Sequence, residues 1–366
     1  MTSALFSPTR IAPLALANRI VVSPMCQYSA DDGVPTVWHR QHLGWLATTG
    51  AGLVIVEATG VTAASRITHG CTGIWGDAHE AMFAALVRDM KATGPAPVGI
   101  QLAHAGRKAS AQVPWEGGGP LRPEQRPWPT LAPSALAHAA GWHAPASFDA
   151  AGIAGLARDF AAAARRAVHA GFDLVELHAA HGYLLHQFLT PLANRRDDAY
   201  GGTAEKRMRA PLEIAAALRE AWPAGKALGA RITGCDWIEG GLTVEDAVAF
   251  AQRLKSIGYD YVCVSSGGID GAKIPLGPGY QVPLAERVKR DASIATMAVG
   301  LIVDPLLAES IVREGRADTV ALARGFLDDP RWAWRAAETL GAPAPVPVQY
   351  ARSRPGLWPG AKLKAA

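Results

Sequence analysis

The chain has 366 residues, and 49% of them are apolar, which is enough to bury a sizeable core. Its 36 basic and 32 acidic residues leave a formal net charge of +4, and no basic run exceeds three residues, which argues against a nucleic-acid or anionic-membrane partner. The four cysteines form no C-x-x-C pair, no secretory leader is recognisable, and no apolar run approaches the roughly 20 residues that span a bilayer. We therefore expect a cytoplasmic protein without a zinc or disulfide framework.

Short apolar runs typical of strands recur along the chain, with stretches typical of helices between them. The predicted strands are 20–24, 52–57, 98–102, 174–178, 227–233, 261–265, 295–299 and 319–323. The clearest predicted helices are 80–92, 152–170, 204–222, 244–257 and 305–314. This alternation predicts an α/β fold with parallel strands, a single-domain (β/α)8 TIM barrel over residues 1–366. A doubly wound sheet is the alternative, but no G-x-G-x-x-G follows the first strand.

Two long connections interrupt the alternation. Residues 105–147, after the third strand, are rich in Pro, Gly and Trp, and connections of this length are usually lids or linkers. Because regular structure resumes on both sides, we expect a lid over the barrel mouth. The second connection runs from 189 to 202, and Thr203 can cap the helix that follows. The C-terminal tail, about 345–366, is bounded by prolines and is typical of a frayed end.

Several predicted strands contain one polar residue in an apolar run: Glu57, Gln101, Glu176 and Arg231. Barrel interiors are usually filled by branched apolar side chains, so these residues either form a buried ion-pair network or bind a ligand. Both interpretations stay open for the two glutamates. For Gln101 and Arg231 we favour a ligand role, because they lie toward the carboxyl ends of their strands, where a barrel holds its active site.

The predicted strand 174–178 leads directly to His178, His181 and Tyr183. Two imidazoles and a phenol within a few residues form a cluster of hydrogen-bond donors, which can hold an oxygen atom and deliver a proton. One alternative is a pair of ordinary surface histidines. Another is a zinc site that adds His186, but the spacing fits tetrahedral ligation poorly and no carboxylate lies at a helical i, i+3 or i+4 position.

Gly300 follows the seventh strand, and Arg324 with Gly325 ends the eighth. Barrels often bind a phosphate group through these two loops, where glycine allows backbone N–H groups to approach and arginine offers a bidentate fork. The pair therefore predicts a phosphate site. A phosphosugar aldolase or isomerase would also need one, but neither Lys226 nor Lys273 is convincingly placed at a strand end for Schiff-base chemistry.

The motif from His178 to Phe188 and its continuation from Thr190 to Gly202 resemble the Old Yellow Enzyme family, whose members are FMN-dependent ene-reductases on an (α/β)8 barrel. The resemblance extends from Leu5 to the C-terminus. Other stretches similar to the family are Asn18-Arg-Ile, Pro24-Met25-Cys26-Gln27-Tyr28, Glu57-Ala-Thr, Gln101-Leu-x-His104-Ala-Gly-Arg107-Lys108 and Ala323-Arg324. The setting of Cys26 resembles the branch called thermophilic-like or xenobiotic-reductase-like.

The resemblance implies a function and a set of site residues. NADPH or NADH would reduce bound FMN, and the enzyme would then reduce an activated C=C bond of an unsaturated carbonyl or nitro compound by ping-pong kinetics, with hydride from flavin N5. The catalytic residues implied are His178, His181 and the proton donor Tyr183, with no metal. Those implied to bind FMN are Pro24, Met25, Cys26, Gly60, Gln101, Arg231, Gly300, Leu301, Ala323 and Arg324. Those implied to bind the substrate are Tyr28, His178, His181 and Arg352.

The resemblance also implies a homodimer or homotetramer, in which a C-terminal arginine reaches the neighbouring subunit's active site. Gln349-Tyr350-x-Arg352 matches this tail, and Arg354 is the alternative arginine. The competing interpretation is a non-catalytic flavin-binding protein that senses redox state through Cys26. It accounts for a flavin site but not for the cluster of His178, His181 and Tyr183.

Overall fold

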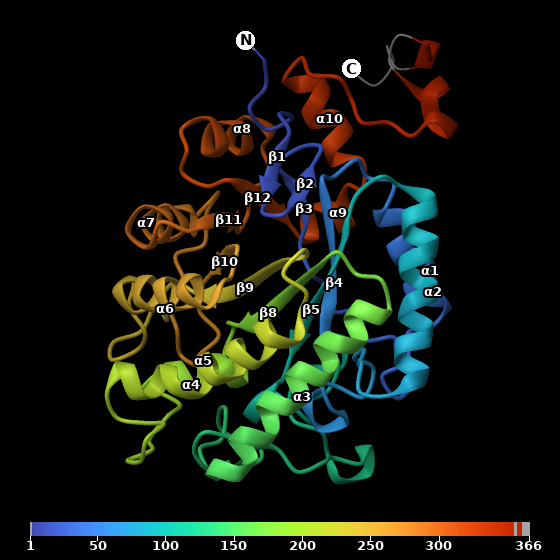
Figure 1. Cartoon of the computed structure of the whole chain (residues 1–366). Coiled ribbons are helices and arrows are strands. Elements are labelled where there is room, and N and C mark those ends of the chain that lie inside the picture. Colours follow the sequence, from blue (N-terminus) through green and yellow to red (C-terminus); the bar gives the residue numbers. More distant parts are fainter. Residues whose placement is uncertain (1, 355–356, 361–366) are drawn as a thin grey trace.

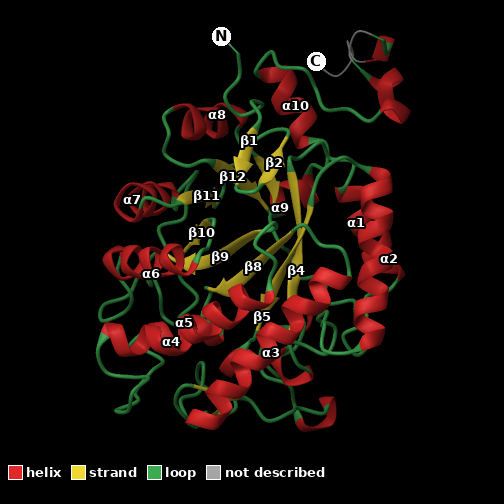
Figure 2. Cartoon of the chain, in the orientation of Figure 1, coloured by secondary structure: helices red, strands yellow, loops and turns green. Residues whose placement is uncertain are grey.

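The computed structural model describes residues 2–354 and 357–360. Parallel strands close into a barrel, in the order β10-β11-β12-β3-β4-β5-β8-β9, with the helices around them (Figures 1 and 2). The barrel strands are β3 (Ile20–Val22), β4 (Leu53–Gly60), β5 (Val98–Ala103), β8 (Leu174–Ala179), β9 (Ala227–Thr233), β10 (Tyr261–Ser265), β11 (Ala295–Val299) and β12 (Thr319–Leu322). The predicted (β/α)8 barrel is thus confirmed, and the doubly wound sheet is excluded.

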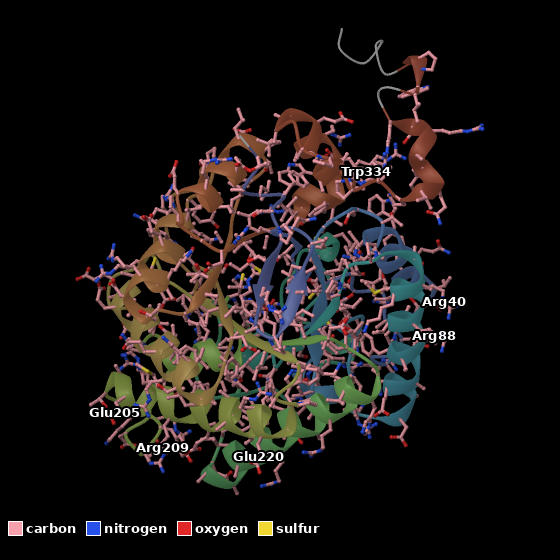
Figure 3. The ribbon with its side chains drawn as sticks, turned by 45° about the horizontal axis from the view of Figure 1, so that its top comes forward. Arg40, Arg88, Glu205, Arg209, Glu220 and Trp334 are labelled. Atoms are coloured by element: carbon pink, nitrogen blue, oxygen red, sulfur yellow. The ribbon has the colours of Figure 1, made fainter. Side chains whose placement is uncertain are left out.

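The helices form the outer layer of the barrel. They are α1 (Val37–Leu46), α2 (Asp77–Thr93), α3 (Ala150–His169), α4 (Leu184–Leu189), α5 (Ala204–Ala221), α6 (Val244–Ile257), α7 (Val282–Ala292), α8 (Pro305–Arg313), α9 (Arg324–Asp328) and α10 (Trp332–Thr339). Every helix predicted from the periodicity is present. Their charged side chains, such as Arg40 on α1, Arg88 on α2 and Glu220 on α5, lie on the outside of the protein (Figure 3).

Helices α3 and α5 show why the local sequence folds as it does. On α3, Ile153, Leu156 and Phe160 recur every three or four residues and are buried, so one face packs against the barrel. The side chain of Thr203 accepts a hydrogen bond from Lys206 N–H at the start of α5, as predicted. Helix α1 was not predicted, because its sequence VWHRQHLGWL combines a β-branched first residue with an interior glycine.

A hairpin of β1 (Thr9–Ile11) and β2 (Leu14–Leu16) closes the amino end of the barrel, and it was not predicted. Ile11 and Leu16 are buried with Val21, Leu53 and other side chains of the barrel interior. Full burial of such an aliphatic side chain contributes about 1.5–3 kcal/mol. The hairpin therefore seals one end of the barrel, and the other end is left for loops.

Residues 105–147 form an ordered excursion with short elements of its own. These are the 3-10 turns η2 (Gly106–Lys108), η3 (Pro114–Glu116) and η4 (Pro123–Gln125), and the strand β6 (Leu131–Ala132), which pairs with β7 (Ala146–Ser147). Arg196, from the second long connection, donates to Pro133 O at 2.9 Å and to Phe148 O at 2.6 Å. The two excursions are thus tied together.

Within residues 2–354 and 357–360, no helix has both the length and the apolar character that a membrane span requires.

Candidate active site

The cluster predicted from the motif assembles at the carboxyl end of β8. The ring of His178 lies 5.2 Å from that of His181 and 5.0 Å from that of Tyr183, measured between ring centroids, and both contacts are edge-to-face. His178 is 3% exposed, and Tyr183 is the N-cap residue of α4. The three side chains therefore form one compact group, and the reading as ordinary surface histidines is wrong for His178.

Burial sets the protonation state of this group. It lowers the pKa of both His178 and His181 well below the ordinary value, and the nearby cation Arg231 adds to the effect. Burial also raises the pKa of Tyr183 well above the ordinary value. At neutral pH the site therefore contains two neutral imidazoles and a protonated phenol, which can all donate hydrogen bonds.

The hydrogen bonds around each ring indicate its tautomer. His178 Nδ1 accepts from Ala180 N–H at 3.2 Å, so the proton of the neutral ring lies on Nε2. His181 Nε2 lies 2.6 Å from Ser265 Oγ, and the Ser265 hydroxyl donates to Gln281 Oε1 at 3.3 Å. Ser265 Oγ is therefore the acceptor for His181 Nε2–H. A ligand oxygen would compete with Ser265 for this donor.

Lys108 supports the same loop from the lid side, although it was not predicted to be a site residue. Its Nζ donates to His181 O at 2.9 Å and lies 4.9 Å from the centroid of the Tyr183 ring. Burial, together with the neighbouring Arg107, lowers its pKa to about 8. The only sequence signal was its position at the end of the stretch from Gln101 to Lys108.

Glu176 forms a buried network at the centre of the barrel, which settles the alternative left open for this residue. Its carboxylate accepts from Gln101 Nε2 at 2.7 Å and from the Tyr261 hydroxyl at 2.8 Å. Burial raises the pKa of Glu176, and the nearby Arg231 counteracts that effect. Gln101 was expected to bind a ligand, yet here its amide N–H is directed at Glu176. Only its oxygen and remaining N–H are left for a ligand.

Arg231 provides a test of whether a cofactor fits. Its Nη1 donates to Ser23 Oγ at 3.0 Å, while its buried Nε has no hydrogen-bond partner. A buried guanidinium N–H without an acceptor is costly, so this position favours a ligand that brings an anionic or carbonyl oxygen. The pyrimidine side of a flavin would supply such an oxygen.

A cavity of about 310 Å³ continues from Arg231 and His181 to the loops after β11 and β12. Its lining includes the four residues predicted to hold the phosphate: Gly300, Leu301, Ala323 and Arg324. Gly300 has φ +116°, and a Cβ there would lie 2.5 Å from Gln281 Nε2, so only glycine fits. The cavity therefore combines the predicted phosphate cradle with Arg231, whose Nε has no hydrogen-bond partner. Ala323 was expected to end a strand, but β12 ends at Leu322.

Glu57 lies in a register shift of β4, where Val56 pairs with Ile100 and Ala58 with Gln101. Such a bulge redirects a side chain, and here the Glu57 carboxylate lies 3.2 Å from His39 Nε2 and accepts from Gln27 N–H at 3.0 Å. Glu57 is thus buried beside a partner, His39, that no sequence pattern had indicated. The contact supports the segment of Pro24, Met25 and Cys26.

Cys26 and Tyr28 lie in the segment between β3 and α1. Burial raises the pKa of Cys26 well above the ordinary value, so its thiol stays protonated. Tyr28 has φ +51°, and its ring contacts the exposed ring of Trp115 from the lid, 5.9 Å between centroids. Gly60 ends β4, and together with Cys71 and Tyr183 it lines a small neighbouring cavity.

Arg352 does not join the site of its own chain. It lies exposed in the 3-10 turn η5 (Val348–Ser353). The preceding residues 345–349 line a groove with Asn18, Gly52 and Pro97, which lie one or two residues before strands β3, β4 and β5. The tail therefore runs along the amino end of the barrel, opposite to the clustered histidines, and Figure 1 shows it far from the lid.

The alternative of a zinc site is not supported. The part of the chain that the structure describes contains no group of three or more residues that could ligate a metal ion. A phosphate cradle, followed by a buried guanidinium group and then by neutral hydrogen-bond donors, is instead the arrangement of a barrel oxidoreductase that holds a phosphorylated flavin.

Comparison with known proteins agrees with this class. The model of the NADH:flavin oxidoreductase / NADH oxidase family matches residues 4–342. An NADPH dehydrogenase of Geobacillus sp. (strain WCH70) is 46% identical over 354 residues, covering 96% of this chain and 99% of the relative. The NADPH dehydrogenase of Bacillus subtilis (strain 168) is 42% identical over the same length, with the same shares covered.

Among solved structures, morphinone reductase superposes with a TM-score of 0.77 at 30% identity, covering 94% of this chain and 91% of that one. A complex of morphinone reductase with tetrahydroNAD gives a TM-score of 0.76 at 28% identity, covering 94% and 93%. The chain belongs to the NADH:flavin oxidoreductase / NADH oxidase family, which includes the Old Yellow Enzymes. It is an FMN-dependent oxidoreductase, and the predicted family, cofactor and enzyme class are confirmed.

The buried histidines predict how stability depends on pH. In the unfolded chain they titrate near pH 6.5, whereas the folded pKa of His178 is lowered, so the unfolded state binds more protons below that pH. The free energy of unfolding should therefore fall as pH drops from 7 to 5. Over this range the free energy of unfolding of the variant His178→Asn should fall by about 1–2 kcal/mol less than that of the wild type. Urea denaturation at both pH values measures the difference.

The exposed His169 provides the matched control, because His169→Asn removes a histidine from the surface and leaves the site intact. If His178→Asn and the wild type show the same pH dependence, His178 is not held neutral by the fold.

Proposed function

We propose that this chain is an NADPH dehydrogenase that acts as an ene-reductase: it reduces activated C=C bonds of unsaturated carbonyl or nitro compounds by ping-pong kinetics. The observation that supports this most is the contact of the neutral His178 with both the neutral His181 and the protonated Tyr183, beside a cavity lined by His181 and Arg231. A non-catalytic flavin-binding sensor would need no such cluster of donors.

The residues around the cavity would hold FMN, which when bound supplies the hydride for the reaction. Gly300, Leu301, Ala323 and Arg324 would bind its phosphate, and Arg231 would stabilise negative charge that develops on the pyrimidine side. The flavin ring would contact Pro24, Met25, Cys26, Gly60 and Gln101. The protonated thiol of Cys26 is a weak donor, and its position would tune the reduction potential.

We call the pair of His178 and His181 the oxygen clamp. Two imidazole N–H donors directed at one carbonyl or nitro oxygen polarise the alkene, and in the transition state each such donor contributes about 2–4 kcal/mol. Tyr183, which contacts His178, would then protonate the α-carbon. Tyr28 would line the space for the rest of the substrate. Nicotinamide also has a carboxamide oxygen, so NADPH can use the same clamp before the substrate does.

The direct test is an anaerobic titration of the purified holoprotein. NADPH should bleach the flavin absorbance, and cyclohexenone should restore it. A reduced flavin that cyclohexenone does not reoxidise would contradict the ene-reductase proposal and leave the family assignment intact.

The oxygen clamp gives a first mutational prediction. His178→Ala or His181→Ala should slow both flavin reduction by NADPH and alkene reduction by roughly 10²-fold, because both substrates use the same donors. Stopped-flow absorbance measures the two half-reactions separately. Loss of alkene reduction alone would show that NADPH does not use the clamp.

Tyr183 gives a different pattern. Tyr183→Phe should leave flavin reduction unchanged, since that step takes no proton from the enzyme, and should slow alkene reduction by about 10²–10⁴-fold. Nitro compounds should be affected less, because their reduced form can be protonated in solution. Equal damage to both half-reactions would mean that the Tyr183 ring only packs against His178.

We also propose that the chain forms a homodimer or homotetramer in which Arg352 enters the neighbouring active site, with Arg354 as the alternative. Two facts support this: Arg352 is exposed and far from its own site, and Val348, Tyr350, Leu357 and Trp358 expose apolar surface along the same tail. Reciprocal exchange of a tail fits an isologous two-fold dimer.

Removing the tail after Val348 should raise KM for the unsaturated substrate and weaken the dimer, while FMN stays bound. Steady-state kinetics and analytical ultracentrifugation would measure the two effects. Arg352→Ala is the finer variant and should raise KM without changing the oligomeric state. A truncated protein with unchanged kinetics and mass would contradict the tail exchange.

A further inference from the structure

The third histidine of the central motif, His186, has no role in the oxygen clamp. It lies on α4 and is fully buried, with 0% of its surface exposed. Its ring accepts a hydrogen bond from Gly182 N–H, which lies between the donors His181 and Tyr183. We call the segment of His181, Gly182 and Tyr183 the clamp loop.

The clamp loop has a backbone conformation that needs support from its surroundings. His181 has φ +60° and Gly182 has φ +72°, so two consecutive residues lie in the left-handed region, which non-glycine residues rarely adopt. A Cβ on Gly182 would lie 2.1 Å from Gly268 O, so no side chain fits there.

Each backbone N–H and C=O group of His181 and Gly182 forms a hydrogen bond with a side chain. Lys108 and Gln187 donate to the two carbonyl oxygens, while Thr233 and His186 accept from the two N–H groups. The contacts are Lys108 Nζ to His181 O at 2.9 Å, His181 N–H to Thr233 Oγ1 at 3.3 Å, Gly182 N–H to His186 Nδ1 at 2.7 Å, and Gln187 Nε2 to Gly182 O at 2.7 Å.

The hydrogen bond to Gly182 fixes the tautomer of His186. Because Nδ1 accepts the Gly182 N–H, the proton of the neutral ring lies on Nε2. Nε2 faces Asp236 Oδ1 at 2.8 Å, although the oxygen lies off the N–H direction. The other oxygen, Oδ2, accepts from the Thr190 hydroxyl at 2.7 Å and from Leu242 N–H at 2.8 Å.

Asp236 is a buried carboxylate that stays ionised. Burial alone would raise its pKa, but its hydrogen bonds, which include those from Leu242 and Thr190, hold the pKa below the ordinary value. An ionised carboxylate can only accept hydrogen bonds, so it favours a proton on the near nitrogen of His186 and leaves the far nitrogen free to accept.

We propose that Asp236 and His186 are positioning residues of the oxygen clamp: the carboxylate keeps the His186 proton on Nε2, so that Nδ1 holds the Gly182 N–H and with it His181 and Tyr183. This inference rests on the proposed function, because it assigns these two residues a role in aligning the clamp. Neither residue belongs to the group that would contact the substrate.

The variant Asp236→Asn tests the inference with almost no change in volume. Thr190 and Leu242 both donate to Oδ2, so they would orient the amide oxygen toward themselves and the amide NH2 toward His186. Nε2 must then accept, and the ring proton moves to Nδ1, where it opposes the Gly182 N–H. Phenol serves as the probe, because its oxygen can accept hydrogen bonds from the oxygen clamp. Its Kd, read from the flavin absorbance of the holoprotein, should rise about tenfold, with FMN retained.

Two further measurements separate positioning from stability. The ¹⁵N shifts of the His186 ring should report a proton on Nδ1 in Asp236→Asn and on Nε2 in the wild type. The control Thr190→Val removes a different hydrogen bond to the same carboxylate. It should lower Tm while the tautomer and the Kd of phenol stay unchanged.

Substitution of His186 itself gives an independent test. The amide of His186→Asn can take the place of Nδ1 and accept from Gly182, whereas His186→Gln reaches toward Asp236 and leaves Gly182 unpaired. We expect His186→Asn to retain the higher affinity for phenol. The reverse order would mean that pairing Asp236 is the only role of the ring, and would overturn the inference.

An Asp236→Asn protein with an unchanged His186 tautomer and an unchanged Kd of phenol would also overturn it. The proposed function fails by a different result, namely a wild-type protein whose NADPH-reduced flavin is not reoxidised by cyclohexenone.

Discussion

The site depends on one buried carboxylate, Glu176, which lies inside the barrel. It binds Gln101 on β5 and Tyr261 on β10, and it lies close enough to Arg231 on β9 for their charges to interact. A buried guanidinium without a counter-charge would be strongly destabilised, and so would the carboxylate alone. Because each stabilises the other, the barrel can keep a permanent positive charge directly below the cavity where a flavin would place its own negative charge.

The remaining polar groups of the site follow a similar rule, in which a side chain from a distant segment fixes each functional group. Ser265 and Gln281 orient His181, and Lys108 binds the clamp loop from the lid side. His39 approaches the bulged Glu57, which in turn holds the backbone next to Cys26. The functional side chains lie toward the strand ends, but their orientation is set by residues up to 208 positions away in the chain, as for Arg231 and Ser23.

The barrel and the donor cluster could be predicted from the sequence, because both follow from patterns within short stretches of the chain. The apolar strand runs and amphipathic helices were sufficient for the barrel, and the spacing of His178, His181 and Tyr183 was sufficient for the donor cluster. The supporting residues could not be found in this way. His39 lies on a helix with weak helical sequence, and Glu57 depends on a bulge that shifts the register of β4. Such contacts follow from tertiary packing, which leaves no periodic signal in one sequence.

The position of the C-terminal tail has a geometric consequence for any assembly. Residues 345–349 lie at the amino end of the barrel, whereas the donor cluster lies at the carboxyl end. With the proposed exchange of Arg352, one subunit's tail must start beside the sealed end of its own barrel and finish at the open end of the next. Two barrels related by a two-fold axis satisfy this only when they stand side by side with their axes antiparallel. The two active sites of such a dimer would then open in opposite directions, each beside the sealed amino end of the other barrel.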